Sequence, residues 1–146
     1  LDYAKSLRDQ DPTAPVTHII EFARGTEHGG FRAAFEHLSQ QVLQNAAILY
    51  INVSWKESLR KNRKRFNPDR PDSILQHSLP DAKLERLYRG SDWAEVTGTN
   101  PDFINIRGYQ VPYAVLENED DVTSKPGSDL AARLETCLTK LAKLKA

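Results

Sequence analysis

The sequence predicts an α/β fold, a three-layer α/β/α sandwich with a mainly parallel sheet. Three segments, 16–22, 47–53 and 111–116, are apolar and rich in β-branched or aromatic residues, as buried strands are. Apolar residues at helical spacing occupy stretches between and after them. Strands that alternate with helices are joined by right-handed crossovers and pair in parallel. We therefore expect residues 1–146 to form a single α/β domain.

Glycine and helical periodicity organise the chain after the first expected strand. Pro15 ends whatever precedes this strand, and Gly25, Gly29 and Gly30 follow it in a flexible loop. A helix is expected over 31–44, where aromatic and aliphatic residues recur on one face.

The second expected strand leads directly into a helix. Residues 47–53 are nearly continuously apolar, which is typical of a parallel strand covered on both faces. Ser54, with Glu57 three residues later, has the spacing of a capping box and predicts a helix that ends near Arg65.

The remaining elements follow from turn residues and periodicity. Pro80 occupies a favoured first-turn position for a short helix that ends at Tyr88. Residues 90–110 are rich in Gly, Asn, Asp and Thr and are expected to form a loop with a short hairpin around 104–106. A last helix over about 128–145 carries one apolar face, made of Leu130, Leu134, Cys137, Leu138, Leu141 and Leu144.

Composition narrows the possible functions. Twenty basic residues balance twenty acidic ones, so no overall field attracts nucleic acid or an anionic membrane. The one cysteine, Cys137, lies on the apolar face of the last helix, where a buried core thiol is expected. No long apolar run and no signal-like N-terminus are present, so a cytoplasmic protein is expected. The sequence contains no methionine, and we expect it to be part of a longer protein.

Parallel sheets bind ligands beyond the carboxyl ends of their strands. The candidate ligand-binding segments are therefore 21–24, 52–54 and 117–121. Glu21 is suited to holding Mg²⁺ through water or to accepting a hydroxyl proton. Arg24 is suited to a bidentate contact with a phosphate or carboxylate. The alternative is a local Glu–Arg ion pair at a strand end.

A basic run follows the second strand and has two main interpretations. One is a solvated helix face, and the other is a mobile cationic lid that closes over a polyphosphate. Nucleic-acid binding is disfavoured because few aromatic residues are interleaved with the cations. The run comprises Lys56, Arg60, Lys61, Arg63, Lys64, Arg65 and Arg70.

The end of the third strand offers a further candidate. Asn118 could recognise a nucleobase edge, although the acidic residues around it are more typical of a turn. The four histidines show no paired metal-ligand spacing, and no Gly-x-Ser-x-Gly motif of a serine hydrolase is present.

Taken together, these segments resemble P-loop kinases of the nucleotide, nucleoside and shikimate/gluconate kinase type, over about residues 16–121. Ile-Ile-Glu-Phe-Ala-Arg-Gly at 19–25 resembles the third strand of that fold. Residues 49–54, with Leu59 and 62–65, resemble the fourth strand and the helix that feeds the lid. Val111 to Asn118 resembles the fifth strand and the loop beside the adenine.

The resemblance implies a function and a set of site residues. The implied reaction is ATP-dependent phosphoryl transfer to a small hydroxyl- or phosphate-bearing substrate, with ATP and Mg²⁺ as cofactors. A lid-like region would cover about 60–92. The implied site consists of Glu21 as base or metal partner, Arg24 as substrate clamp, Arg63 and Arg65 as lid cations, Lys64 and Arg70 as weaker phosphate contacts, and Asn118 at the nucleobase.

The chain departs from that family in one respect. The phosphate-binding loop, Gly-x-x-x-x-Gly-Lys-Ser/Thr, is absent from the sequence. In the family the strand before that loop lies between the third and fourth strands, so we expect this chain to be the C-terminal portion of a kinase domain. The alternative is a non-catalytic nucleotide- or protein-binding module with a kinase-like fold.

Overall fold

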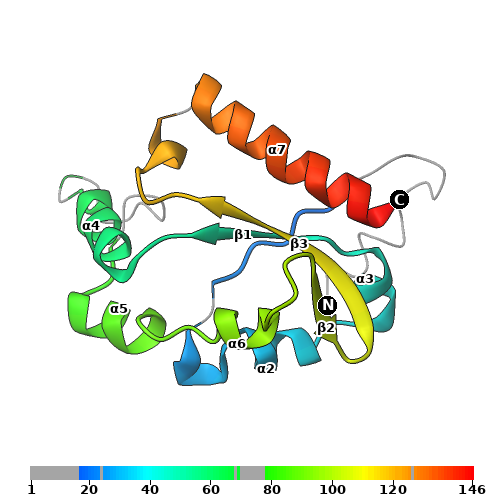
Figure 1. Ribbon diagram of the computed structural model, residues 1–146. Coiled ribbons are helices and arrows are strands. Elements are labelled where there is room, and N and C mark those ends of the chain that lie inside the picture. The colour runs from blue at the N-terminus through cyan, green and yellow to red at the C-terminus, as the bar shows by residue number, and fades with distance from the viewer. Residues whose placement is uncertain (1–16, 24, 68, 70–77, 126) are drawn as a thin grey trace.

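The computed structural model describes residues 17–23, 25–67, 69, 78–125 and 127–146. Its centre is a sheet of three strands in the order β1-β3-β2. The strands are β1 (Ile48–Asn52), β2 (Phe103–Ile106) and β3 (Tyr109–Glu117). Helix α7 (Ser128–Lys145) runs along one side of this sheet, and α2 (Gly30–Glu36) and α6 (Trp93–Thr97) lie on the other (Figure 1). Among the described residues, no helix has both the length and the apolar character needed to cross a membrane.

The expectation of a mainly parallel three-layer sandwich is wrong. β1 pairs with β3 in parallel, but β2 pairs with β3 antiparallel, so the small sheet is mixed. The cause is the connection between β2 and β3, in which Arg107 and Gly108 both have positive φ, 53° and 87°. Two such residues form a tight hairpin turn, whereas a parallel pair needs a long crossover. The short hairpin expected around 104–106 is therefore confirmed.

Pro112 lies within β3 without breaking the sheet. The Tyr113 N–H donates to the Asp102 carbonyl at 2.9 Å, which fixes the side of β3 that faces β2. Successive residues of a strand direct their backbone N–H and C=O groups to opposite edges. Pro112, which is paired with Phe103 and precedes Tyr113, therefore directs its nitrogen away from β2. Proline, which has no N–H, therefore costs the β2–β3 ladder no hydrogen bond.

The helices confirm part of the expected pattern. The expected helices ending at 65, 88 and 145 are confirmed as α4 (Trp55–Arg65), α5 (Asp81–Tyr88) and α7. The single helix expected over 31–44 is instead two, α2 and α3 (Gln40–Asn45). They are separate because Ser39 adopts an extended conformation and its Oγ accepts from the Val42 N–H, which starts a new helix. Within the expected loop 90–110, α6 is an additional helix.

The strand expected over 16–22 is not present in its described part. Residues 17–23 have no regular secondary structure, and Val16 lies outside the described residues. Ile19 is 86% exposed and Ile20 53% exposed, so neither is the buried strand residue that the pattern predicted. Phe22 does join the core margin, where its ring centroid lies 6.1 Å from that of Phe31.

Each face of the sheet has its own apolar core. Towards α7, the buried residues are Ala114, Leu116, Val122, Cys137 and Leu141, which confirms the expected burial of the thiol. The opposite face buries Phe35, Leu43, Ile104, Ile106, Val111 and Tyr113. On that second face Tyr50 stacks on Trp93 with ring centroids 3.9 Å apart. β3 therefore contributes to both cores through alternate residues.

Asp92 fixes the start of α2 from a distant part of the chain. Its buried carboxylate accepts from the backbone N–H groups of Phe31 at 2.8 Å and Arg32 at 3.0 Å. These N–H groups have no partner within the helix, so Asp92 satisfies them as a capping residue would. A Cβ on Gly30 would lie 2.3 Å from this carboxylate, so the contact requires glycine there.

Gly25 is buried against the end of α5. A Cβ at this position would lie 1.9 Å from the Leu87 carbonyl oxygen and 2.9 Å from the Tyr88 Cα. Both neighbours are backbone atoms, which cannot swing aside as a flexible side chain can. The glycine therefore permits a close contact between the segment before α2 and the end of α5.

We predict that Gly25→Ala destabilises the protein by about 3 kcal/mol, because the added methyl group must displace backbone. Urea unfolding followed by circular dichroism measures the loss. The matched control is Gly127→Ala, since Gly127 has extended backbone and a Cβ there meets no atom closer than 3.9 Å. The control should cost about 1 kcal/mol or less, as a helix-capping glycine does. Equal losses in the two variants would contradict the packing argument.

Candidate functional site at the carboxyl ends of β1 and β3

The parallel pairing of β1 with β3 brings together two of the three segments that were expected to bind a ligand, 52–54 and 117–121. Asn52, at the end of β1, is paired with Glu117, at the end of β3. The Asn52 Nδ2 donates to Glu117 Oε2 at 2.8 Å, and the Asn118 N–H donates to the Asn52 carbonyl at 2.9 Å. The expectation that 52–54 and 117–121 share one edge of the sheet is therefore confirmed.

The start of α4 is capped by residues that follow both strands, Ser54 after β1 and Glu119 after β3. Ser54 Oγ accepts from the Glu57 N–H at 3.2 Å, as the predicted cap requires. In a complete capping box Glu57 would accept from the Ser54 N–H, but Glu119 does so here, at 2.9 Å. Glu119 also accepts from Ser54 Oγ at 2.7 Å, and these hydrogen bonds lower the pKa of Glu119.

Four charged residues, Glu57, Arg60, Lys61 and Asp121, form what we call the α4 anchor. Arg60 donates to both Glu57 oxygens and, at 2.7 Å, to Asp121 Oδ2. Lys61 Nζ lies 3.1 Å from the other Asp121 oxygen. The pKa of Asp121 is lowered, first by a hydrogen bond from Ser124 Oγ and then by that from Arg60. The anchor ties the first turns of α4 to the loop after β3.

Asn118 has a structural role in that loop. The residue is 4% exposed, its Nδ2 donates to Thr123 Oγ1 at 2.8 Å, and its Oδ1 accepts from the Thr123 N–H at 3.2 Å. Both ends of the amide are therefore engaged within the turn. This arrangement matches the turn that the acidic surroundings of Asn118 favoured, and it gives no support to a nucleobase contact.

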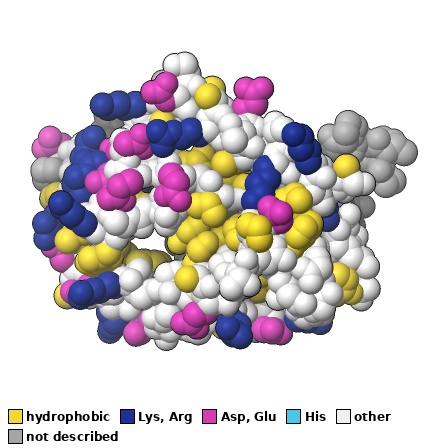
Figure 2. All heavy atoms as spheres, in the orientation of Figure 1, with side chains coloured by type: hydrophobic (Ala, Val, Ile, Leu, Met, Phe, Trp, Pro, Cys, Tyr) yellow, Lys and Arg dark blue, Asp and Glu magenta, His cyan; other side chains and the backbone are white. Residues whose placement is uncertain are grey.

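The last turn of α4 carries Arg63, Lys64 and Arg65, which we call the basic end of α4. All three are exposed. Arg63 pairs with Asp81 of α5, whereas Lys64 and Arg65 make no ion pair with any described residue. Lys and Arg side chains gather on the side of the molecule where α4 and α5 lie (Figure 2). The basic end is thus the candidate site for an anionic ligand.

Helical geometry separates the two expected lid arginines. Successive residues turn by about 100° around the helix axis, so Arg63 and Arg65 leave it about 200° apart. They cannot meet one phosphate group from the same side of α4. Arg63 and Lys64 lie closer together around the axis, and they form the more compact pair for a phosphate.

The other expected site residues are not assembled with the basic end by any contact in the described chain. Glu21 is exposed within the irregular segment 17–23, and Arg24 and Arg70 lie outside the described residues. Within the described part of the chain, no three His, Cys, Asp or Glu side chains are grouped as metal ligands. Mg²⁺ is commonly held by one or two carboxylates together with substrate phosphates and water, so the role of Glu21 as a metal partner stays a prediction.

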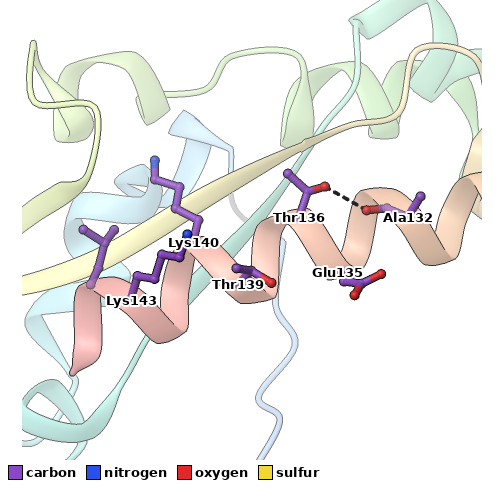
Figure 3. A pocket seen from close by; sticks show the side chains of 7 residues that line it. Ala132, Glu135, Thr136, Thr139, Lys140 and Lys143 are labelled. Atoms are coloured by element: carbon purple, nitrogen blue, oxygen red, sulfur yellow. Dashed lines mark hydrogen bonds between the residues drawn. The ribbon is translucent and has the colours of Figure 1, made fainter.

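Two of the shallow hollows on the described surface lie elsewhere. One, of about 640 Å³, is lined by residues of α7, including Glu135, Thr139 and Lys143 (Figure 3). Lys140, also at its rim, is held by the Pro101 carbonyl at 2.7 Å and by Asp102 at 3.0 Å. The other, of about 290 Å³, lies beside the loop 120–129. Neither hollow is lined by Glu21, Asn118 or the basic end of α4.

Comparisons with protein-family models, curated proteins and solved structures gave no match. The resemblance to P-loop kinases therefore rests on the sequence motifs, and the site is interpreted from its own residues.

We predict that the α4 anchor makes folding stability depend on acid pH. Because the pKa of Asp121 is lowered below its ordinary value of 3.8, the unfolded chain takes up protons first as pH falls. The stabilisation is present above about pH 4 and is lost as pH falls further. Asp121→Asn should therefore show a smaller loss of stability than the unsubstituted protein between about pH 5 and 2, measured by urea unfolding.

Asparagine suits this test because it tolerates the left-handed backbone of Asp121, at φ 59°. The control is Glu135→Gln, which removes an exposed carboxylate from the middle of α7 that makes no ion pair in the described chain. This control should keep the pH dependence of the unsubstituted protein. An Asp121→Asn profile parallel to that of the unsubstituted protein would refute the role of the anchor.

Proposed function

We propose that this chain binds the phosphate groups of ATP and takes part in phosphoryl transfer to a small hydroxyl- or phosphate-bearing substrate. The observation that carries the proposal is the division of α4 into an anchored, charge-neutralised first part and an exposed basic end. The free cysteine, Cys137, is compatible with the cytoplasmic location that this activity implies.

The charge distribution along α4 supports phosphate binding at its end. In the α4 anchor, two cations face two carboxylates, so this part of the helix has no excess charge for a ligand. At the basic end, Arg63 is paired with Asp81, and Lys64 and Arg65 make no ion pair with any described residue, so positive charge is in excess there. Phosphoryl transfer needs cations around the transferred group, and a helix held in place at its other end positions them with little loss of entropy.

The proposal gives roles to four residues. Arg63 and Lys64 would contact the phosphates, and Arg65, on another side of the helix, would contact a different part of the ligand. Glu21 is proposed as the base that accepts the substrate proton. The Mg²⁺ that accompanies ATP would be held mainly by the phosphates and water, and Glu21 is the proposed partner for it in this chain.

The second candidate is a non-catalytic nucleotide- or protein-binding module. Two observations favour it. Glu21 lies in an exposed irregular segment, and the Asn118 amide is engaged at both its nitrogen and its oxygen within its own turn. A binding module needs the basic end alone, without a positioned base. Turnover of ATP separates this candidate from the first.

Basic residues in a last helical turn also stabilise the helix through its dipole, without any ligand. A matched pair of lysines separates this explanation from phosphate binding. Lys64 lies in the last turn of α4 and Lys143 in the last turn of α7, and both are exposed. The dipole effect applies to both lysines, whereas the proposed phosphate contact applies to Lys64 alone.

We predict that Lys64→Ala weakens ATP binding about fivefold and that Lys143→Ala leaves it unchanged, because one charge-assisted contact is lost. Titration of the ¹⁵N-labelled protein with ATP, followed by NMR, measures both affinities and shows which amide signals move. Signals of α4 should move, and binding should weaken as salt is added. Equal effects of the two substitutions, or no shift in α4 at millimolar ATP, would reject the proposed site.

We further predict that Glu21→Gln lowers kcat for ATP-dependent phosphoryl transfer far more than it changes the affinity for ATP. The substitution removes the proton acceptor but no phosphate contact. Coupled ADP release measures turnover, and the NMR titration measures affinity. Unchanged turnover in Glu21→Gln would remove Glu21 from the mechanism. ATP binding without any turnover by the unsubstituted protein would favour the binding module.

A further inference from the structure

We propose that Asp81 is an internal competitor of the ligand, because it occupies an edge of the Arg63 guanidinium that a phosphate would otherwise use. This inference rests on the proposed function, because it concerns the same basic end of α4. The inference adds Asp81 as a residue that lowers the affinity for phosphate without contacting the ligand. Its basis is the geometry of the Arg63–Asp81 pair and the way in which Asp81 is held.

The pair uses two donors of Arg63 that a phosphate could use. Arg63 Nε and Nη2 both donate to Asp81 Oδ2, at 3.0 and 2.6 Å. These two N–H groups lie on one edge of the guanidinium, the edge with which arginine commonly grips a phosphate in a forked contact. Asp81 and a phosphate oxygen cannot occupy this edge together. Binding at this edge therefore requires the ion pair to open.

Asp81 is held in position beside α4 by a buried asparagine. Asn62, 8% exposed, donates from Nδ2 to the Leu79 carbonyl at 2.7 Å and accepts at Oδ1 from the Leu79 N–H at 3.0 Å. Pro80 follows with its φ restricted by its ring, and Asp81 begins α5. The carboxylate is thus held close to Arg63, which raises its effective concentration as a competitor.

The pair is also weak enough for a ligand to displace it. The Arg63 side chain is 63% exposed and that of Asp81 49% exposed, and ion pairs in such surroundings contribute little to stability. Arg60, by contrast, is held by two carboxylates, Glu57 and Asp121, whose side chains are only 11% and 14% exposed. A ligand would therefore exchange with Asp81 at Arg63 and leave the α4 anchor intact.

The experiment measures the affinity for inorganic tripolyphosphate by calorimetry at low salt. Asp81→Asn should tighten binding about three- to fivefold, because Arg63 no longer has to leave a carboxylate. The matched control is Glu85→Gln in the same helix. It removes the same charge from an ion pair of similar exposure, Arg89–Glu85, at 62% and 49%. It should tighten binding much less, by the long-range charge effect alone.

A second pair of variants tests whether the effect acts through Arg63. In an Arg63→Ala background, Asp81→Asn should change tripolyphosphate affinity no more than Glu85→Gln does. Thermal melts of Asp81→Asn check that α5 keeps its fold, since Asp81 also lies in the favourable first turn of that helix. An Asp81→Asn gain that persists without Arg63 would overturn the inference.

The outcomes separate this inference from the proposed function. Binding to the unsubstituted protein with equal effects of Asp81→Asn and Glu85→Gln would overturn the competitor role and leave the phosphate site standing. Binding that appears only in Asp81→Asn would support the competitor role in its strongest form. No binding in any variant would overturn both.

Discussion

The parallel pairing of β1 with β3 is the constraint on which the rest of the structure depends. β3 is the central strand, and its alternate residues supply both apolar cores. Because β1 runs in the same direction, the two strands end at the same edge of the sheet. The helix that leaves β1 and the loop that leaves β3 therefore start side by side. The α4 anchor joins residues 61 positions apart in sequence for this reason.

The sequence predicted best those elements whose signals are local. α4, α5 and α7 were found because helical periodicity, Ser54 and Pro80 lie within or next to the helices themselves. The position of polar residues at the carboxyl ends of β1 and β3 was also predictable, once these two strands were taken to be parallel. The local signals therefore predicted which polar residues lie at that edge, but not which residues they pair with.

Strand pairing is where the prediction of the fold failed. Residues 16–22 are as apolar as a buried strand, but a strand also needs a neighbour, and the pattern does not show whether one is available. In the described part of this segment no ladder forms, and Ile19 and Ile20 stay exposed. A short hairpin around 104–106 was expected, but not that its first strand, β2, would join the central sheet as the antiparallel neighbour of β3.

The site shows the same division between local and distant information. Arg60, Arg63 and Lys64 look alike in the sequence, since all three are basic residues of one helix. Their roles differ because their acidic partners differ, and apart from Glu57 in the same helix those partners come from other parts of the chain. Asp121 neutralises Arg60 from the loop after β3, and Asp81 pairs with Arg63 from the start of α5. The sequence could show a basic helix, but not which of its cations are already paired.

The same reasoning explains why the two ends of α4 differ in what they can bind. A cation between two poorly exposed carboxylates binds them more strongly than it would bind an anion from solution. Such a cation holds the helix in place and does not bind a ligand. A cation with one exposed partner, or none, loses little when a phosphate replaces that partner or water. The position of a ligand site along a basic helix is therefore set by where the acids are. In this chain the acids gather at the sheet edge, and the ligand is left with the far end of α4.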